Sequence, residues 1–162
     1  MSCGTASLSI TLWMAAMGPG PVGTPALSGQ LAITAPLSVA HEPLFAGTVG
    51  QADGLKKVVE GFRTMAPADA SELLPMTDFD EFSRKIAALS ALDENGRLAL
   101  VNRGATDDLK CILHGISQDP PVKLKDVSEA KMPKARDLAL RDMVYLLNDN
   151  VEVITSPPQP AA

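Results

Sequence analysis

Residues 51–65, QADGLKKVVEGFRTM, decide the fold class because their apolar side chains recur at the spacing of an α-helix. The apolar positions i, i+3, i+4, i+7 and i+10 are Leu55, Val58, Val59, Phe62 and Met65. Residues at these spacings share one face of a helix, and the charged residues between them fall on the other face. Asp53 is well placed to cap this helix, and Pro67 to end it. The stretch therefore predicts an amphipathic helix.

Similar patterns follow toward the middle of the chain. Thr77 is the expected cap of a second helix, whose apolar stripe consists of Phe79, Phe82, Ile86 and Leu89. Asp93 is the expected cap of a short third helix that ends before Gly104. Residues 97–101, RLALV, also have the composition of a strand, but no partner strand lies nearby in the sequence. We therefore favour a helix there.

Three further helices are predicted in the C-terminal part. Thr106 caps the first of them, Pro120 takes the first position of the second, and Pro133 opens the last, which runs to about residue 148. Residues 151–154 are expected to be extended. The sequence contains no internal repeat, and we find no heptad run long enough for a coiled coil. The predicted fold is all-α, a compact bundle of five or six short helices.

The composition agrees with helix packing and argues against nucleic-acid binding. Hydrophobic residues make up 46% of the chain but aromatic residues only 4%, so Leu, Val, Ile, Ala and Met must build the core. The formal net charge is −5, and no face enriched in Lys and Arg is visible. Binding to nucleic acid requires such a face. We therefore expect no nucleic-acid partner.

The charges divide the chain into two parts. All 14 basic and 19 acidic residues lie from Glu42 onward, whereas the segment before it carries no charged side chain. We therefore expect an uncharged, Pro/Gly-rich leader over residues 1–40 and a linker over residues 41–50. The helical domain is expected over residues 51–154, and a disordered tail over residues 155–162.

The leader contains an apolar run over residues 8–17, LSITLWMAAM. A membrane-spanning helix needs roughly 20 apolar residues, so no integral membrane span is predicted. A run of this length matches the apolar region of a signal peptide, with small residues for cleavage at Ser38 and Ala40 or at Ala16 and Gly18. The sequence thus favours a periplasmic or secreted protein. The alternative is a cytoplasmic protein with a disordered N-terminal tail, because Lys and Arg are missing from the start of the leader.

Residues 107–116, DDLKCILHGI, place Cys111 and His114 three residues apart on a predicted helix. Neighbours at this spacing could both reach one metal ion. The only other histidine and cysteine are His41 and Cys3, so carboxylates would have to complete the ligand shell. The alternative is a small thiol at the core edge beside a half-exposed imidazole. No cofactor is predicted, and one helix turn supplies neither the third group nor the oxyanion site of a nucleophilic enzyme.

The last predicted helix carries more apolar residues than a single inward face needs. Leu140, Val144 and Leu147 lie on a different side from Leu138, Met143 and Leu146. An excess apolar strip often marks a binding surface for a protein partner or for self-association. The alternative is a central helix surrounded by the others. The sequence favours a small exported helical protein that acts by macromolecular interaction rather than catalysis. The alternative function is a ligand- or metal-binding bundle that uses Cys111 and His114.

Overall fold

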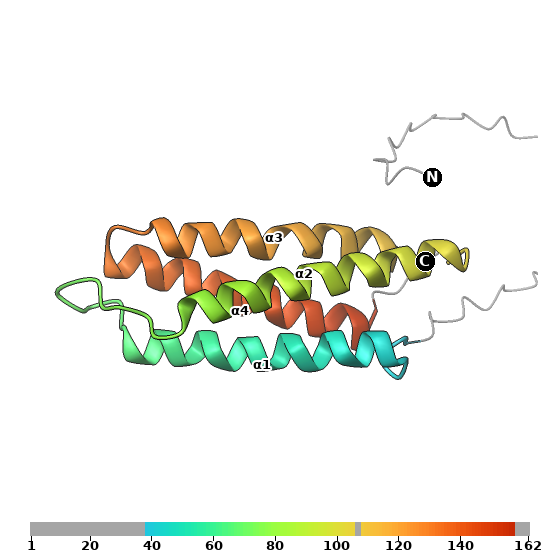
Figure 1. The fold of residues 1–162 in the computed structure, drawn as a ribbon, viewed down its shortest axis with the longest axis horizontal. Coiled ribbons are helices and arrows are strands. Elements are labelled where there is room, and N and C mark those ends of the chain that lie inside the picture. Colours follow the sequence, from blue (N-terminus) through green and yellow to red (C-terminus); the bar gives the residue numbers. More distant parts are fainter. Residues whose placement is uncertain (1–37, 106–107, 158–162) are drawn as a thin grey trace, which may run out of the picture. The chain divides into compact units, whose positions relative to one another are not determined.

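A computed structural model describes residues 38–105 and 108–157 of the chain, and these residues form an all-α fold (Figure 1). The described residues contain four helices and no strand. The helices are α1 (Pro43–Met65), α2 (Phe79–Asn102), α3 (Leu109–Glu129) and α4 (Pro133–Thr155). The predicted fold class is confirmed, while the expected number of five or six short helices is replaced by four long ones.

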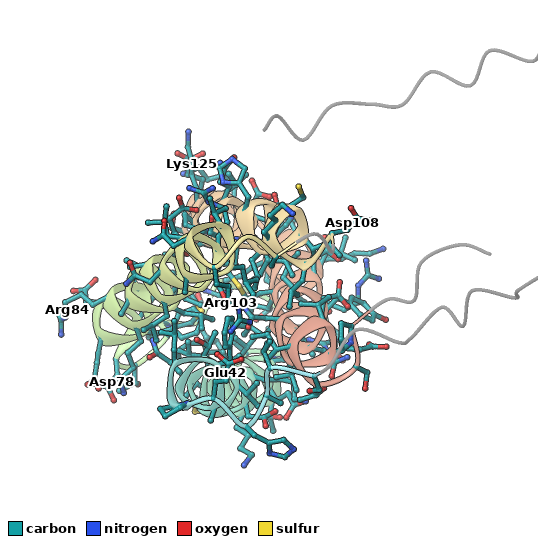
Figure 2. All side chains as sticks on the ribbon, turned by 90° about the vertical axis from the view of Figure 1, so that its right-hand side faces the viewer. Glu42, Asp78, Arg84, Arg103, Asp108 and Lys125 are labelled. Carbon is teal, nitrogen blue, oxygen red and sulfur yellow. The ribbon has the colours of Figure 1, made fainter. Side chains whose placement is uncertain are left out.

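The helices form an antiparallel bundle in which each helix packs against the two beside it. α1 contacts α2 and α4, and α3 contacts the same two helices from the opposite side. Glu42, just before α1, binds Arg103, just after α2, at 2.9 Å, and Figure 2 shows these two side chains pointing toward each other. This ion pair joins the start of α1 to the end of α2. In the part of the chain that the structure describes, α1 and α3 make no close backbone approach, and neither do α2 and α4, so these are the diagonal pairs.

The core residues follow a heptad pattern, which we did not expect from the sequence. The buried positions of α1 and α2 alternate in steps of three and four residues, and most buried positions of α4 do the same. They are Phe45, Thr48, Ala52, Leu55, Val59 and Phe62 on α1, and Phe82, Ile86, Leu89, Asp93, Gly96 and Leu100 on α2. This spacing keeps a narrow seam of side chains facing the neighbouring helices, as in coiled coils and four-helix bundles.

Two predicted helix boundaries are absent because the inward pattern continues across them. Asp93 does not cap a new helix but lies inside α2, which is helical throughout residues 97–101. Leu98 and Val101, two apolar residues of this stretch, are 42% and 45% exposed. Pro120 and Pro121 lie inside α3 rather than at a helix start. Each proline removes one backbone hydrogen-bond donor, which destabilises the helix. The burial of the Pro120 side chain at an inward position offsets part of this cost.

The ends of the bundle also differ from the predicted domain boundaries. α1 begins at Pro43, so most of the expected linker over residues 41–50 is helix. Residues 151–154, expected to be extended, belong to α4. Thr106, an expected cap, lies outside the described residues, as do most of the leader and residues 158–162 of the tail. None of the helices in the described part is long and apolar enough to cross a membrane.

Candidate functional site

The buried apolar residues of the bundle fall into two separate clusters. The large cluster contains Ala52, Leu55, Val59, Phe62, Phe82, Ile86, Leu89, Val127, Ala139, Leu140, Met143 and Leu147. The small cluster contains Val39, Phe45, Leu100, Leu109, Leu113 and Ile154 and lies toward the end where α1 begins. Three of the four helices contribute a buried polar residue between the two clusters.

These residues form what we call the polar layer: Thr48 of α1, Asp93 of α2 and Asn150 of α4, each only 1% exposed. On each helix the residue lies between a member of the large cluster and a member of the small one. The Thr48 hydroxyl donates to the Leu44 carbonyl one turn earlier in its own helix, at 3.1 Å. The Asn150 amide Nδ2 donates to Asp93 Oδ2 at 2.7 Å. Because α2 and α4 are diagonal, this hydrogen bond crosses the bundle core.

The polar layer contains polar atoms that find no partner. Asp93 Oδ1 and Asn150 Oδ1 are both buried without a hydrogen-bond partner. Burial raises the pKa of Asp93 to about 7, and the hydrogen bond from Asn150 lowers it by less. Buried polar atoms are nearly always paired, since an unpaired one costs about 1–3 kcal/mol. Asp93, a buried carboxyl group with a pKa of about 7, is therefore the most chemically unusual group in the described core.

A second candidate site is an apolar groove on the surface between α1 and α2, which we call the outer groove. It has a volume of ≈ 540 Å³, and its floor includes Leu55, Phe62 and Phe82. Val58 and Met65, two turns apart on α1, line one side and are 39% and 59% exposed. The remaining lining residues are Gly61, Thr77, Asp78, Glu81 and Lys85. α1 and α2 are the least closely packed of the neighbouring helix pairs, which leaves this groove open.

Cys111 and His114, the predicted metal ligands, lie on the first turns of α3. The His114 side chain is 52% exposed, with Nδ1 3.4 Å from Glu94 Oε2 and Nε2 3.0 Å from Gln118 Nε2. Cys111 is partly buried. Within the described residues, no group of three or more His, Cys, Asp or Glu side chains is arranged to hold a metal ion. A metal site here stays a prediction, and it would require Cys111 as a free thiolate.

The predicted partner-binding strip on the last helix is not a surface in this bundle. Leu140 and Leu147 are fully buried in the large cluster, and Val144 is partly buried against it. They line the core because residues three and four apart along α4 all face α1 and α3. The large apolar residues of α4 that are exposed are Leu138 and Tyr145 instead.

Neither the polar layer nor the outer groove was predicted from the sequence, although the polar layer has a recognisable sequence pattern. Thr48, Asp93 and Asn150 each lie in phase with the apolar residues three and four positions away, so each marks a polar residue at an inward position. Asp93 was instead expected to cap a helix, and the last helix was expected to end near residue 148, before Asn150. The outer groove left no such signal, because Val58 and Met65 have the same spacing as core residues.

The chain matches no known protein family, no curated protein and no solved structure. Its function therefore has to be inferred from its own geometry.

Proposed function

We propose that this protein acts by binding another protein, and that the outer groove receives an amphipathic helix of that partner. The single observation behind this proposal is the exposure of Val58 and Met65 beside a groove that the bundle itself leaves unfilled. Apolar side chains two turns apart along a groove match the i, i+3, i+4 and i+7 anchors of a helix.

The glycine in the groove supports a helical occupant. A Cβ atom added to Gly61 would meet nothing within 4 Å, so the backbone of a second helix could approach α1 closely there. Glycine inside a helix costs about 1 kcal/mol relative to alanine. A close approach by a partner would offset that cost.

The charges at the edge of the groove favour a basic partner. Asp78 and Glu81 line the α2 side, and Glu81 binds Lys85 at 2.6 Å. Asp78 is exposed at the start of α2, where Figure 2 shows its side chain directed outward. A partner helix with Lys or Arg beside its apolar face would complement this edge.

Site-specific photocrosslinking tests the proposal in the native host. A photoreactive residue replacing Val58 should crosslink to one partner protein through a helical segment, whereas the same residue replacing the neighbouring, outward-facing Lys57 should not. Crosslinks to a second copy of this chain would show that the outer groove binds another copy of the protein rather than a different partner. Equal yields at both positions would remove the outer groove as a binding site.

Binding of the identified segment should then depend on the groove residues. Burying a valine or methionine side chain contributes about 1.5–3 kcal/mol, so Val58→Lys or Met65→Lys should weaken binding at least about tenfold. Tyr145→Lys is the matched control, because Tyr145 is 62% exposed but lies on α4, outside the groove. Fluorescence anisotropy with the labelled segment measures the three affinities. Equal affinities for all three variants would contradict the proposal.

Export of the protein is also proposed, on the apolar run over residues 8–17. Val39, within one of the two candidate cleavage sites, is 6% exposed and belongs to the small cluster. Cleavage after Ala40 would remove this side chain from the core, so the bundle favours cleavage near residue 18. The intact mass of the protein from its native host would show whether the leader is removed and at which residue.

A further inference from the structure

The polar layer contains two buried oxygen atoms that lack a hydrogen-bond donor. They belong to Asp93 and Asn150, which already share one hydrogen bond. Asn150 donates one amide hydrogen to Asp93 Oδ2 at 2.7 Å, while Asp93 Oδ1 and Asn150 Oδ1 have no partner. An ionised carboxylate only accepts hydrogen bonds, and an amide oxygen also only accepts. As long as Asp93 is ionised, the two oxygens cannot satisfy each other.

We infer that Asp93 binds a proton in the folded bundle and pairs with Asn150 through two reciprocal hydrogen bonds. The proton comes from the solvent and forms an O–H bond at Oδ1, which leaves the carboxyl group neutral. Asp93 Oδ1 then donates to Asn150 Oδ1, while Asn150 Nδ2 continues to donate to Asp93 Oδ2. One proton thus provides partners for both orphan atoms, and no net charge remains buried.

The surroundings of Asp93 favour the neutral form. The inward positions at this level are Thr48 on α1 and Ile116 on α3, neither of which titrates. The Thr48 hydroxyl is already used by Leu44 in the same helix. The nearby charged or titratable groups lie at the partly or fully exposed surface: Glu94, Arg97, His114, Asp149 and Glu152. Arg97, one turn further along α2, binds Glu94 at that surface at 2.7 Å.

The acid–amide pair links the diagonal helices of the bundle, so its proton couples pH to the packing of α2 against α4. In the unfolded chain, the Asp93 carboxyl loses its proton near its ordinary pKa of 3.8, whereas burial raises the folded pKa to about 7. Between these two values the folded protein holds a proton that the unfolded chain releases. Stability should therefore fall as the pH rises from about 4 toward 7 and then level off.

Two measurements on the full chain test this inference. The ¹³Cγ resonance of Asp93, followed by NMR against pH, should titrate with a midpoint near 7, whereas a midpoint at or below the ordinary value would overturn the inference. The melting temperature should be lower at pH 8 than at pH 5 in the unmodified protein. Asp93→Asn should reduce this difference, because an amide pairs with Asn150 through the same two hydrogen bonds without titrating.

The control is Asp149→Asn, which alters an exposed carboxyl group next to Asn150 in the sequence. It should keep the pH dependence of the unmodified protein. The same difference in melting temperature between pH 5 and 8 in Asp93→Asn and in Asp149→Asn would overturn the inference. If Asp93→Asn does not fold, the NMR titration of the unmodified protein still decides the outcome.

Discussion

The large cluster and the polar layer lie next to each other in one bundle core, and they make opposite contributions to it. The large cluster buries apolar side chains from all four described helices, and its contacts have no preferred direction. The polar layer buries three polar residues, with one directional hydrogen bond across the diagonal. We infer that the first provides most of the stability and the second selects one register of α2 against α4.

This division explains how polar residues can persist in a core rich in Leu and Val. Heptad seams made only of apolar residues fit several registers almost equally well. A buried polar residue excludes registers in which its partner is displaced, because it would then be left unpaired. The outer groove is a third kind of region, where apolar residues of α1 remain exposed because α2 lies too far away to cover them.

The largest effect is expected in the large cluster. Leu140→Ala removes a side chain that is 0% exposed and leaves a cavity, so it should lower the free energy of unfolding by about 2–5 kcal/mol. Leu138→Ala on the same helix is the control, because Leu138 is 41% exposed and should change stability by at most about 0.5 kcal/mol. Urea denaturation measures both. Equal losses would show that α4 does not face the core as described.

An intermediate effect on stability is expected in the polar layer. Replacing Asn150 alone should destabilise the protein, whereas replacing both Asp93 and Asn150 should not. Asn150→Leu deletes the side-chain donor to Asp93 in the described core and should cost about 1–3 kcal/mol. The double variant Asp93→Leu/Asn150→Leu should be at least as stable as the unmodified protein, and up to about 4 kcal/mol more stable. Urea denaturation at pH 7 compares the three proteins. A double variant as unstable as the single one would mean that the layer is held by other contacts.

The all-α fold class could be predicted from the sequence, because the apolar spacing of an amphipathic helix can be recognised within each segment. The first predicted helix stands within α1, and the predicted start of the last helix at Pro133 is the observed start of α4. The number of helices was wrong because Asp93 and Pro120 were interpreted as local boundary signals. Their positions are determined by tertiary contacts, since both lie at inward positions of a continuous heptad seam.

The candidate sites were beyond local reasoning for a related reason. Asp93 and Asn150 are separated by 57 residues, and nothing in either segment indicates the other. The apolar residues on two sides of the last helix predicted an exposed strip there, but Leu140 and Leu147 lie in the core, and Val58 and Met65 of α1 are exposed instead. Which of two apolar faces is covered depends on the spacing between helices. The sequence of one helix does not encode that spacing.

The smallest effect on stability is expected at two helix glycines, Gly54 on the surface of α1 and Gly96 beside the polar layer. A Cβ atom at Gly54 would meet nothing within 4 Å, so Gly54→Ala should stabilise α1 by up to about 1 kcal/mol through helix propensity alone. A Cβ atom at Gly96 would lie 3.0 Å from Phe45 Cε1 and 3.5 Å from Leu113 Cδ1. The Phe45 ring is 1% exposed and cannot move into solvent, so the gain in helix propensity should be outweighed by overpacking.

Gly96→Ala should therefore lower the free energy of unfolding, by about 1 kcal/mol, while Gly54→Ala raises it. Thermal denaturation of both variants at one pH gives the two signs directly. A stabilising Gly96→Ala would show that the side chains of the small cluster can shift to accommodate an added methyl group near Asp93. The polar layer would then be bordered by a loose region on that side, and its hydrogen bond alone would have to keep α2 and α4 in register.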